Sequence, residues 1–333
     1  MRVLVTGGAG FIGGHVITRL LSEGHTVASI DRAPLVHVSG AEEFRVDLLN
    51  RVATHHALIQ FQPQVVLHLA ARTDLAEKKN IEGYRDNIDA VESLVSGIAA
   101  TPSVRHWICT SSQLVSRVGY APRHDQDYAP DTKYGESKVR TEQITRSLDG
   151  GGVPWAIVRP TTIWGPRMNP HYLRFFAMVR DGRYFHVGDG PDLKSYGYVG
   201  NTAEQYAALV TAPVESIHRR TFYLADYEPL SLAAWAEMFR AAMNAPRIRR
   251  LPLGLARIAA RIGDMIALGY RDFPLTSFRL RNVMTAYTAD TRPMQDICPS
   301  LPYHVSEGVA ATTHWLQTVW QEEKSAGQKD AAT

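Results

Sequence analysis

Short apolar runs alternate with amphipathic stretches through the first half of the chain, and this alternation predicts strands followed by helices. Residues 3–5 are β-branched or aliphatic and uncharged, which is typical of a buried strand, and Thr6-Gly7 ends the run. Helical periodicity follows over residues 11–21. The same patterns predict strands over 26–30, 44–48, 64–69, 106–110 and 155–158, and helices over 52–61, 83–100 and 134–148.

This order of elements places the chain in the α/β class. Alternating strands and helices to about residue 160 imply a right-handed, doubly wound parallel sheet. Ligands of such sheets bind at the carboxyl ends of the strands. Segment 159–166 is predicted to be the exit loop of the sixth strand.

The pattern changes in the second half, which predicts a smaller, interleaved lobe. Residues 1–170 are expected to form the sheet domain with returns near 201–225, and residues 171–333 mainly the second lobe. Helices are predicted over 172–180, 201–211, 231–243 and 307–322, and a strand over 221–224. The tail from about residue 324 is expected to be flexible.

A helix beginning at Leu251 is strongly amphipathic. One face carries Leu251, Leu255, Ile258, Ile262 and Met265, and Arg257 and Arg261 lie off that face. Such a helix can lie on a membrane surface. Burial of its apolar face against its own lobe is the expected arrangement.

Composition narrows the class of protein. The chain has 333 residues, 45% apolar and 21% charged, with a formal charge of +3, as expected for a soluble globular protein with two lobes. The basic cluster 247–250 is not interleaved with aromatic residues, so nucleic acid is not an expected partner. No apolar stretch reaches bilayer length, no signal peptide is evident, and two cysteines make no disulfide framework, so a cytoplasmic location is expected.

Three glycines follow the first strand at three-residue spacing, at Gly7, Gly10 and Gly13. In a strand–turn–helix unit, the first glycine permits the tight turn and the second lets the backbone approach a pyrophosphate. The third lets the helix pack closely on the strand. The N–H groups at the helix start then face the anion. The segment therefore predicts a dinucleotide site.

Asp31 ends the second strand about twenty residues beyond these glycines. A carboxylate there accepts hydrogen bonds from ribose hydroxyls and repels a 2′-phosphate, which favours NAD over NADP. The neighbouring Arg32 is a guanidinium able to accommodate that phosphate, so NADP stays the less favoured alternative.

Tyr134 and Lys138 lie four residues apart on one predicted helical face, and Ser112 follows the fifth strand. A phenol is a poor base near neutrality, but a nearby ammonium group and an oxidised nicotinamide favour the phenolate and lower the phenol pKa. Tyr134 is then able to take a proton from a substrate hydroxyl or return one to a ketone, while Ser112 holds the same oxygen. The histidines show no spacing with cysteines or carboxylates that predicts a metal site.

With these motifs the chain resembles an extended short-chain dehydrogenase/reductase of the NAD-dependent epimerase/dehydratase family over nearly its full length. The resemblance implies a Rossmann domain, a substrate lobe, a catalytic triad of Ser112, Tyr134 and Lys138, and commonly a homodimer through two Rossmann-domain helices. The residues that it implies for NAD binding are Gly7, Gly10, Phe11, Ile12, Gly13, Asp31, Arg32, Asp47, Leu48, Leu69, Ala70, Ala71, Asn87, Tyr134, Lys138, Pro160 and Ile163.

The chain departs from this family's pattern where substrate is expected. Gln113-Leu114 replaces the acidic pair of family dehydratases, which disfavours dehydration and decarboxylation. Val115-Ser116-Arg117 lacks a common substrate-facing tyrosine, and Tyr198-Val-Gly-Asn201 is similar to hydroxysteroid dehydrogenase relatives. Thr162 stands where many sugar-nucleotide epimerases place asparagine, and Lys194 where an arginine often holds pyrophosphate. With Arg281, these two residues are the candidate substrate contacts.

The motifs are compatible with three functions. The leading one is an NAD-dependent nucleotide-sugar epimerase or ketoreductase of polysaccharide biosynthesis. It would act at a ring hydroxyl, with C4 the expected position, by hydride transfer with Tyr134 as acid and base. The second is a 3-hydroxysteroid or sterol dehydrogenase. The third is an NAD-binding regulator without turnover, which the intact Ser112, Tyr134 and Lys138 argue against.

Overall fold

The computed structural model describes residues 1–75, 77–169, 172–188, 192–267 and 276–330. The chain divides into two compact units. Unit 1 comprises Met1–Ile163, Gly197–Tyr227 and Ala289–Pro302, and unit 2 comprises Trp164–Tyr196, Glu228–Thr288 and Tyr303–Thr333. The first segment of unit 1 therefore ends at Ile163, and the return at Ala289–Pro302 is one that the sequence pattern does not suggest.

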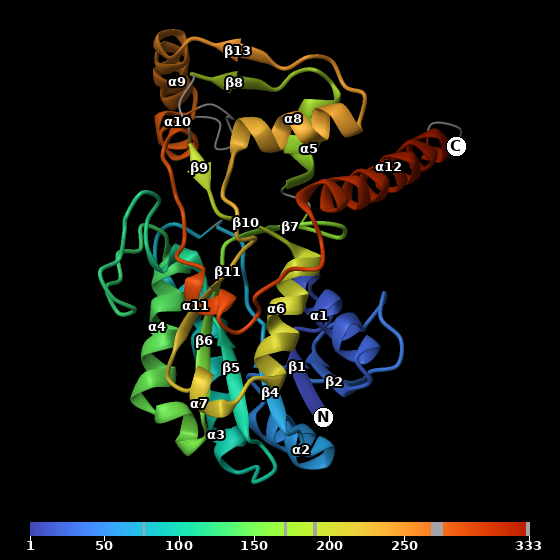
Figure 1. Ribbon diagram of the computed structural model, residues 1–333, viewed down its shortest axis with the longest axis vertical. Helices are drawn as coiled ribbons and strands as arrows, with labels where there is room; N and C mark the ends of the chain where they lie inside the picture. Colours follow the sequence, from blue (N-terminus) through green and yellow to red (C-terminus); the bar gives the residue numbers. More distant parts are fainter. Residues whose placement is uncertain (76, 170–171, 189–191, 268–275, 331–333) are drawn as a thin grey trace. The chain divides into compact units, whose positions relative to one another are not determined.

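Unit 1 is built on a seven-stranded sheet with the order β11-β6-β5-β4-β1-β2-β3 (Figure 1). All neighbouring strands in it are parallel, so the predicted doubly wound α/β sheet is confirmed. Its strands are β1 (Arg2–Thr6), β2 (Thr26–Asp31), β3 (Glu42–Arg45), β4 (Val65–His68), β5 (His106–Thr110), β6 (Trp155–Pro160) and β11 (Thr221–Leu224).

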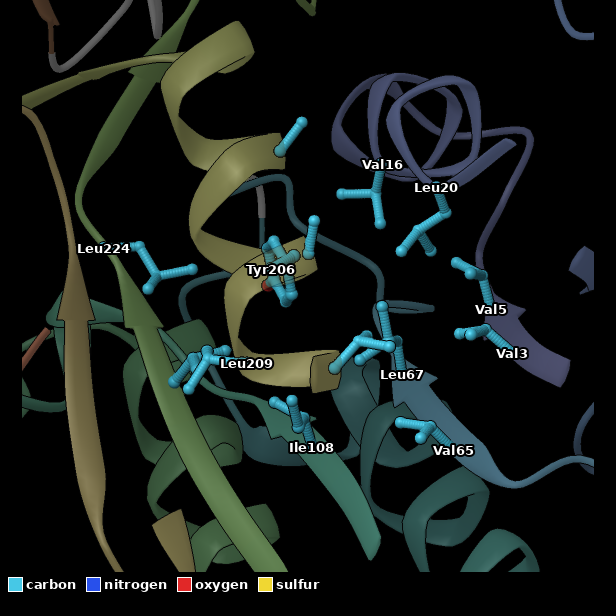
Figure 2. Packing of buried hydrophobic residues seen from close by; sticks show 14 of the residues in the cluster. Val3, Val5, Val16, Leu20, Val65, Leu67, Ile108, Tyr206, Leu209 and Leu224 are labelled. Atoms are coloured by element: carbon cyan, nitrogen blue, oxygen red, sulfur yellow. The ribbon is translucent and has the colours of Figure 1, made fainter. Parts of the chain in front are cut away.

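Helices cover both faces of this sheet (Figure 1). They are α1 (Phe11–Ser22), α2 (Arg51–Phe61), α3 (Arg85–Ala99), α4 (Lys133–Ser147), α6 (Val199–Thr211), α7 (Val214–Ile217) and α11 (Arg292–Gln295), with single turns η1 (Ile81–Tyr84), η2 (Gln113–Val115) and η3 (Asp149–Gly152). One core joins α1 and α6 to the sheet, through residues such as Leu20, Leu67 and Tyr206 (Figure 2). The other core joins α2, α3 and α4 to the opposite face.

The register brings three strand ends to one edge of the sheet. Thr6 lies opposite His68, and His68 lies opposite Cys109, one residue before the end of β5. The loops that follow β1, β4 and β5 therefore start side by side. These loops carry the glycine turn, Ala70-Ala71 and Ser112.

Two strand predictions need correction. The third strand is Glu42–Arg45, so Asp47 and Leu48 lie in the turn that follows it rather than within it. The sixth strand continues to Pro160, since Pro160 lies opposite Leu224 of β11 and the Thr161 N–H donates to the Leu224 carbonyl. The predicted exit loop also holds a further short strand, β7 (Thr162–Trp164), which is not part of the seven-stranded sheet.

Unit 2 is a set of short strands and helices. They are α5 (Leu173–Arg180), β8 (Phe185–Val187), β9 (Leu193–Lys194), β12 (Leu230–Ser231), α8 (Leu232–Ala242), β13 (Arg249–Leu251), α9 (Leu253–Ala267), α10 (Ser277–Met284) and α12 (Val305–Asp330), with β10 (Tyr196–Tyr198) at its border. Trp235 is stacked on Phe175 and on Tyr196, with ring centroids 5.2 and 5.1 Å apart. Strands β8 and β13 pair in parallel.

The backbone of α12 is helical to Asp330, so this helix is longer than the predicted 307–322. One prediction for unit 2 is wrong. The apolar face of α9 is largely uncovered, because Leu255, Ile258, Ile262 and Met265 are all exposed while Ala256 and Ala260 are buried. Within the described ranges, no helix has the length and hydropathy needed to cross a bilayer.

Candidate active site

The glycine turn connects β1 to α1, and two of its glycines are required by close contact. Gly7 has a φ of +75°, and a Cβ there would lie 2.6 Å from the Ala70 nitrogen. A Cβ on Gly13 would lie 2.1 Å from the Gly7 carbonyl oxygen, so only glycine lets α1 start this close to the turn. Gly8, which lies outside the three-residue spacing, is enclosed by side chains instead, with Ser29 Oγ 2.2 Å from an added Cβ.

The N-terminus of α1 fits an anion. Gly10 is its N-cap and makes no side-chain cap, so the first N–H groups of the helix, which belong to Phe11, Ile12 and Gly13, keep no capping side chain. An added Cβ on Gly10 would approach only the Gly7 carbonyl, at 3.1 Å, and its outer side is open. A helix start with this composition is suited to the pyrophosphate of a dinucleotide.

Asp31 is positioned by the same turn. Its carboxylate accepts hydrogen bonds from the Ala9 N–H and the Ala33 N–H, both at 3.0 Å. Arg32, the alternative contact for a 2′-phosphate, lies with its guanidinium 3.7 Å from the Asp47 carboxylate. Leu48 is buried in the core beneath them.

The end of β4 is rigidly held. Thr6 Oγ1 bonds His68 Nδ1 at 2.8 Å and accepts from the Ala70 N–H at 3.2 Å. Burial, with a smaller contribution from the Lys138 charge, lowers the pKa of His68 to about 3, so this histidine is neutral. It is a structural residue of the core. Leu69 and Ala71 flank Ala70 on this strand end.

Asn87 holds the loop that follows. Its side chain accepts from the Arg72 N–H at 2.7 Å and donates to the Arg72 carbonyl at 3.0 Å. Its amide also lies 3.4 Å from Ser137 Oγ on α4. Asn87 therefore ties the end of β4 to the helix that carries the predicted acid/base residue.

The predicted catalytic residues come together in unit 1. Lys138 is buried, and its Nζ donates to the Thr110 carbonyl at the end of β5, at 2.9 Å. Ser112 follows that strand and caps η2 by accepting from the Leu114 N–H. Tyr134 is nearly buried and packs edge-on against Tyr84. Burial lowers the pKa of Lys138, and the neighbouring Cys109 and Glu142 partly oppose this.

Gly135 brings α4 against η2. A Cβ at this position would lie 2.2 Å from the Leu114 carbonyl oxygen. The start of α4 therefore sits on the backbone beside Ser112 only because residue 135 is glycine. The sequence signal for this requirement was the glycine directly after Tyr134.

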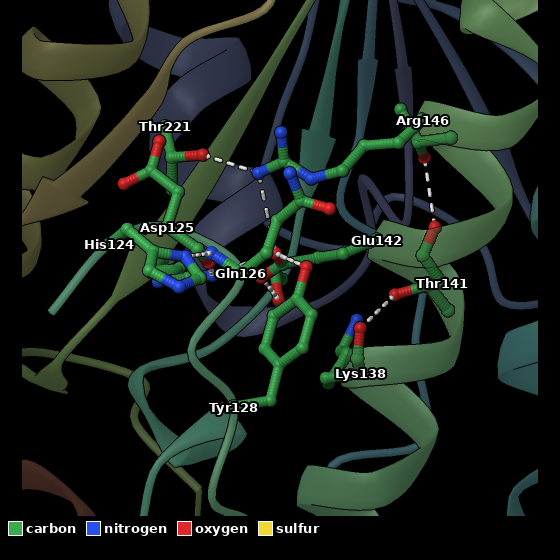
Figure 3. Close-up of polar contacts among 12 residues, drawn as sticks. His124, Asp125, Gln126, Tyr128, Lys138, Thr141, Glu142, Arg146 and Thr221 are labelled. Atoms are coloured by element: carbon green, nitrogen blue, oxygen red, sulfur yellow. Dashed lines mark hydrogen bonds and ion pairs between the residues drawn. The ribbon is translucent and has the colours of Figure 1, made fainter. Parts of the chain in front are cut away.

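A buried ion pair lies next to the proposed catalytic residues, between strand β6 and helix α4. It is not evident from the sequence pattern. Arg159 on β6 donates to both carboxylate oxygens of Glu142 on α4 at 2.8 Å. Ser111 Oγ donates to the same carboxylate at 2.6 Å. The Tyr128 hydroxyl also donates to it, at 3.0 Å (Figure 3). The pKa of Tyr128 is raised to about 12, chiefly by burial, so its hydroxyl keeps its proton.

The candidate substrate residues lie in different environments. In unit 1, Thr162 Oγ1 is 3.3 Å from Gln113 Nε2, so the residue after Ser112 contacts the predicted substrate position. In unit 2, Lys194 Nζ donates to the carbonyls of Asn282 and Thr285 at 2.7 and 2.9 Å. Two of its three donors are thus engaged at the end of α10. Arg281 lies over the Phe278 ring, 5.6 Å from its centroid.

The stretch from Tyr198 to Asn201 has a partner that the sequence did not reveal. Asp226, which follows β11, accepts from the Tyr198 N–H at 3.0 Å and from Asn201 Nδ2 at 2.8 Å. Burial raises the pKa of Asp226 to about 6, although these two hydrogen bonds oppose the shift. Asn201 therefore acts as a donor to a buried carboxyl group.

The chain is similar to several known proteins whose names indicate different substrates. The chain is 28% identical over 305 residues to a 2-alkyl-3-oxoalkanoate reductase of Stenotrophomonas maltophilia, covering 87% of this chain and 88% of the relative. It is 26% identical to a 3 beta-hydroxysteroid dehydrogenase/Delta 5-->4-isomerase of Mycobacterium tuberculosis, covering 79% and 77%. Among solved structures, a UDP-glucuronic acid 4-epimerase from Bacillus cereus, in complex with UDP-glucuronic acid and NAD, superposes with a TM-score of 0.74.

That superposition covers 96% of this chain and 100% of the epimerase chain. Because the two sequences are only 20% identical, it shows a shared fold and nothing about substrate. The family model described as "NAD dependent epimerase/dehydratase family" matches residues 3–225, which span the glycine turn, the Tyr134–Lys138 helix and strand β11. The chain therefore belongs to the NAD-dependent epimerase/dehydratase family of extended short-chain dehydrogenases/reductases.

Proposed function

We propose that this protein is an NAD-dependent ketoreductase or epimerase that acts at a secondary hydroxyl carbon, with Tyr134 as acid and base. The observation that carries this proposal is the placement of Tyr134 and Lys138 on α4, with the Lys138 ammonium anchored to the Thr110 carbonyl and Ser112 at the end of the same strand. NAD supplies the hydride chemistry that no side chain provides.

Tyr134, Ser112 and Lys138 have different proposed roles in proton transfer. The Tyr134 phenolate accepts the proton of the substrate alcohol during oxidation, and the resulting phenol returns it to the carbonyl oxygen during reduction. Ser112 Oγ hydrogen-bonds the same oxygen and orients it. Lys138 carries a positive charge beneath the phenol and stabilises the phenolate. Its firm attachment to the end of β5 means that this charge is already in place before substrate binds.

We assign cofactor binding to the edge of the sheet where β1, β2 and β4 end. The amides at the start of α1 hold the pyrophosphate, and Asp31 accepts from the adenosine ribose. Support for NAD over NADP comes from the Arg32 guanidinium, which lies beside Asp47 and so faces a carboxylate. The turn at Asp47-Leu48, the strand ends 69–71 and 160–163, and Asn87 line the rest of the proposed site.

The first proposed substrate class is a nucleotide-diphosphate sugar, oxidised or epimerised at a ring hydroxyl, with C4 the expected position. Its support is the family and the fold shared with the UDP-glucuronic acid 4-epimerase. Thr162 is the proposed contact to the sugar, and Lys194 and Arg281 are the proposed contacts to the diphosphate. The same resemblance supports a cytoplasmic homodimer as the working form.

A second substrate class is an apolar hydroxy or keto compound, such as a 3-hydroxysteroid or a long-chain 3-oxo acid. Three observations favour it. Gln113-Leu114 supplies no acid after Ser112, and Lys194 uses two of its donors on carbonyls within unit 2. The most fully covered of the relatives described above reduces an alkyl-substituted oxo acid by its name.

The experiment is a substrate panel with the purified full chain. UDP- and dTDP-sugars, 3-hydroxysteroids and long-chain 3-oxo acids are each incubated with NAD, NADH or NADPH, and nicotinamide absorbance and products are measured. Sugar epimerisation without net change in absorbance supports the first class, and net oxidation or reduction of an apolar compound supports the second. Cofactor binding without turnover on every compound would refute the proposal in favour of a regulator.

A further inference from the structure

Helix α9 in unit 2 turns its small residues inward and its large apolar residues outward. Ala256 and Ala260 are buried, where they pack with Leu280 of α10 and, at the edge of the cluster, with Val187 and Met284. The inner face of the helix is therefore fully used. The outer face, which we call the α9 face, consists of Leu255, Ile258, Ile262, Met265 and Ile266.

These side chains are exposed to an unusual extent for their type. Ile258 is 58% exposed and Met265 is 66% exposed, and Phe278 of the adjoining α10 is 49% exposed. Residues 255, 258, 262, 265 and 266 fall at helical spacing, so they form one continuous stripe along α9 rather than scattered contacts. A contiguous apolar stripe on a surface marks an interaction site.

Positive charge borders the stripe. Arg257 and Arg261 lie beside it on α9, and Arg249 and Arg250 on the preceding strand are exposed. The described ranges 247–267 and 276–284 contain seven arginines and a single carboxylate. That carboxylate, Asp264, accepts from the Ser277 N–H and so serves the start of α10. The surface around the α9 face is strongly cationic.

We propose that the α9 face docks unit 2 onto the surface of an anionic phospholipid membrane. An amphipathic helix with large apolar residues on one side and arginines along its border lies in the interface plane, with the apolar side among the acyl chains. At 15 residues, α9 is about 22 Å long, which suits lying in this plane and is too short to span a bilayer. The arginines then meet the phosphate groups.

Charge distinguishes this occupant from a second copy of the chain. A symmetric dimer through the α9 face would place the same surface of both copies together, and Arg257 and Arg261 of each would then face like charge. An anionic bilayer offers negatively charged headgroups that complement these arginines, and an acyl-chain region that can bury the apolar residues of the α9 face. The inference does not depend on which substrate class the active site takes.

Vesicle co-sedimentation of the purified full chain tests the proposal. Vesicles of phosphatidylcholine alone are compared with vesicles that also contain phosphatidylglycerol, and we expect at least ~10-fold stronger binding to the anionic vesicles, weakening as salt rises. Replacing Ile258, Ile262 and Met265 by serine is expected to abolish binding. Arg257→Gln with Arg261→Gln is expected to remove the preference for anionic vesicles.

The matched control uses an apolar exposed pair on another helix. Val52 and Ile59 on α2 are 81% and 54% exposed, and Val52→Ser with Ile59→Ser is expected to bind vesicles like the unchanged protein. Melting temperature and NAD binding verify that every variant is folded. Failure of the unchanged protein to bind anionic vesicles overturns the proposal. A lower molecular mass of the Ile258, Ile262 and Met265 variant by light scattering, without vesicle binding of the parent, assigns the α9 face to a second copy instead.

Discussion

Helices α4 and α9 are equally long, at 15 residues each, and they invert the usual relation between residue type and burial. On α4 the buried residues include Tyr134, Lys138 and Glu142, which are polar or charged. On α9 the large apolar residues such as Ile258 are exposed and only small ones such as Ala260 are buried.

The two helices differ in the partners that neighbouring elements provide for their side chains. Every buried charge on α4 has a partner: Lys138 has the Thr110 carbonyl, and Glu142 has Arg159, Ser111 and Tyr128. Polar burial of this kind is expensive unless it is fully paired, and the pairing on α4 supports the proposed active site. On α9 the apolar face has no covering element among the described residues of unit 2, which marks a surface for something outside the chain.

Tyr134→Phe should produce the largest effect, because it removes the proposed proton-transfer group from the buried face of α4. We expect turnover on the true substrate to fall by about 10² to 10⁴-fold, while NAD still binds. Steady-state kinetics and NAD titration measure the two quantities. Tyr120→Phe, whose hydroxyl donates to the Asp127 carboxylate, serves as the matched control and should keep most of its activity. Retained activity in Tyr134→Phe would mean that the base is another group.

Lys138→Met should also lower turnover by about 10²-fold or more, yet it should not lower the melting temperature at neutral pH. Burial lowers the pKa of Lys138 below its ordinary 10.5, so the folded state pays to keep the ammonium charged. This cost is present in full below the folded-state pKa, declines as the pH rises through that pKa, and is absent above the ordinary pKa of 10.5. Any gain in melting temperature at pH ~7 should therefore shrink at pH ~10. A large loss of stability at neutral pH would contradict this account.

Glu142→Gln should destabilise the fold by about 3–5 kcal/mol, because it leaves the buried Arg159 guanidinium without a compensating charge. The free energy of unfolding in urea is the measurement. The control is Glu136→Gln on the same helix, whose ion pair with Lys133 is partly exposed, at 37% and 29% of the two side chains, and for which about 1 kcal/mol or less is expected. Equal effects of the two substitutions would show that burial does not set the strength of these pairs.

The two faces of α9 should respond in opposite ways to a change of size. Ala260→Leu places a larger side chain against Leu280 in a filled core and should cost about 1–3 kcal/mol. Ile262→Ser on the outer face should change the free energy of unfolding by about 0.5 kcal/mol or less. Thermal and urea unfolding measure both. A larger loss for Ile262→Ser than for Ala260→Leu would show that the α9 face is covered within the chain.

Local chemistry is what made unit 1 predictable. The need for a positive φ at Gly7, the alternation of strands and helices, and the four-residue spacing of Tyr134 and Lys138 are properties of short segments, and the structure reproduces each of them. Even the edge where the strand ends meet follows from the parallel order of the strands. The errors in this unit, at β3 and β6, are errors of strand ends that a neighbouring strand decides.

Tertiary structure alone decided the pairings between distant segments. Nothing in the local pattern near Glu142 or Asp226 names Arg159 or Asn201 as its partner, since a buried charge is satisfied by whichever element folds beside it.

The same holds for α9. Its sequence contains one stripe of alanines and one stripe of large apolar residues, and periodicity cannot say which of them faces the core. In the structure the alanine stripe packs against Leu280 of α10, so the close approach of these two helices, which the local sequence does not encode, decides which stripe faces inward.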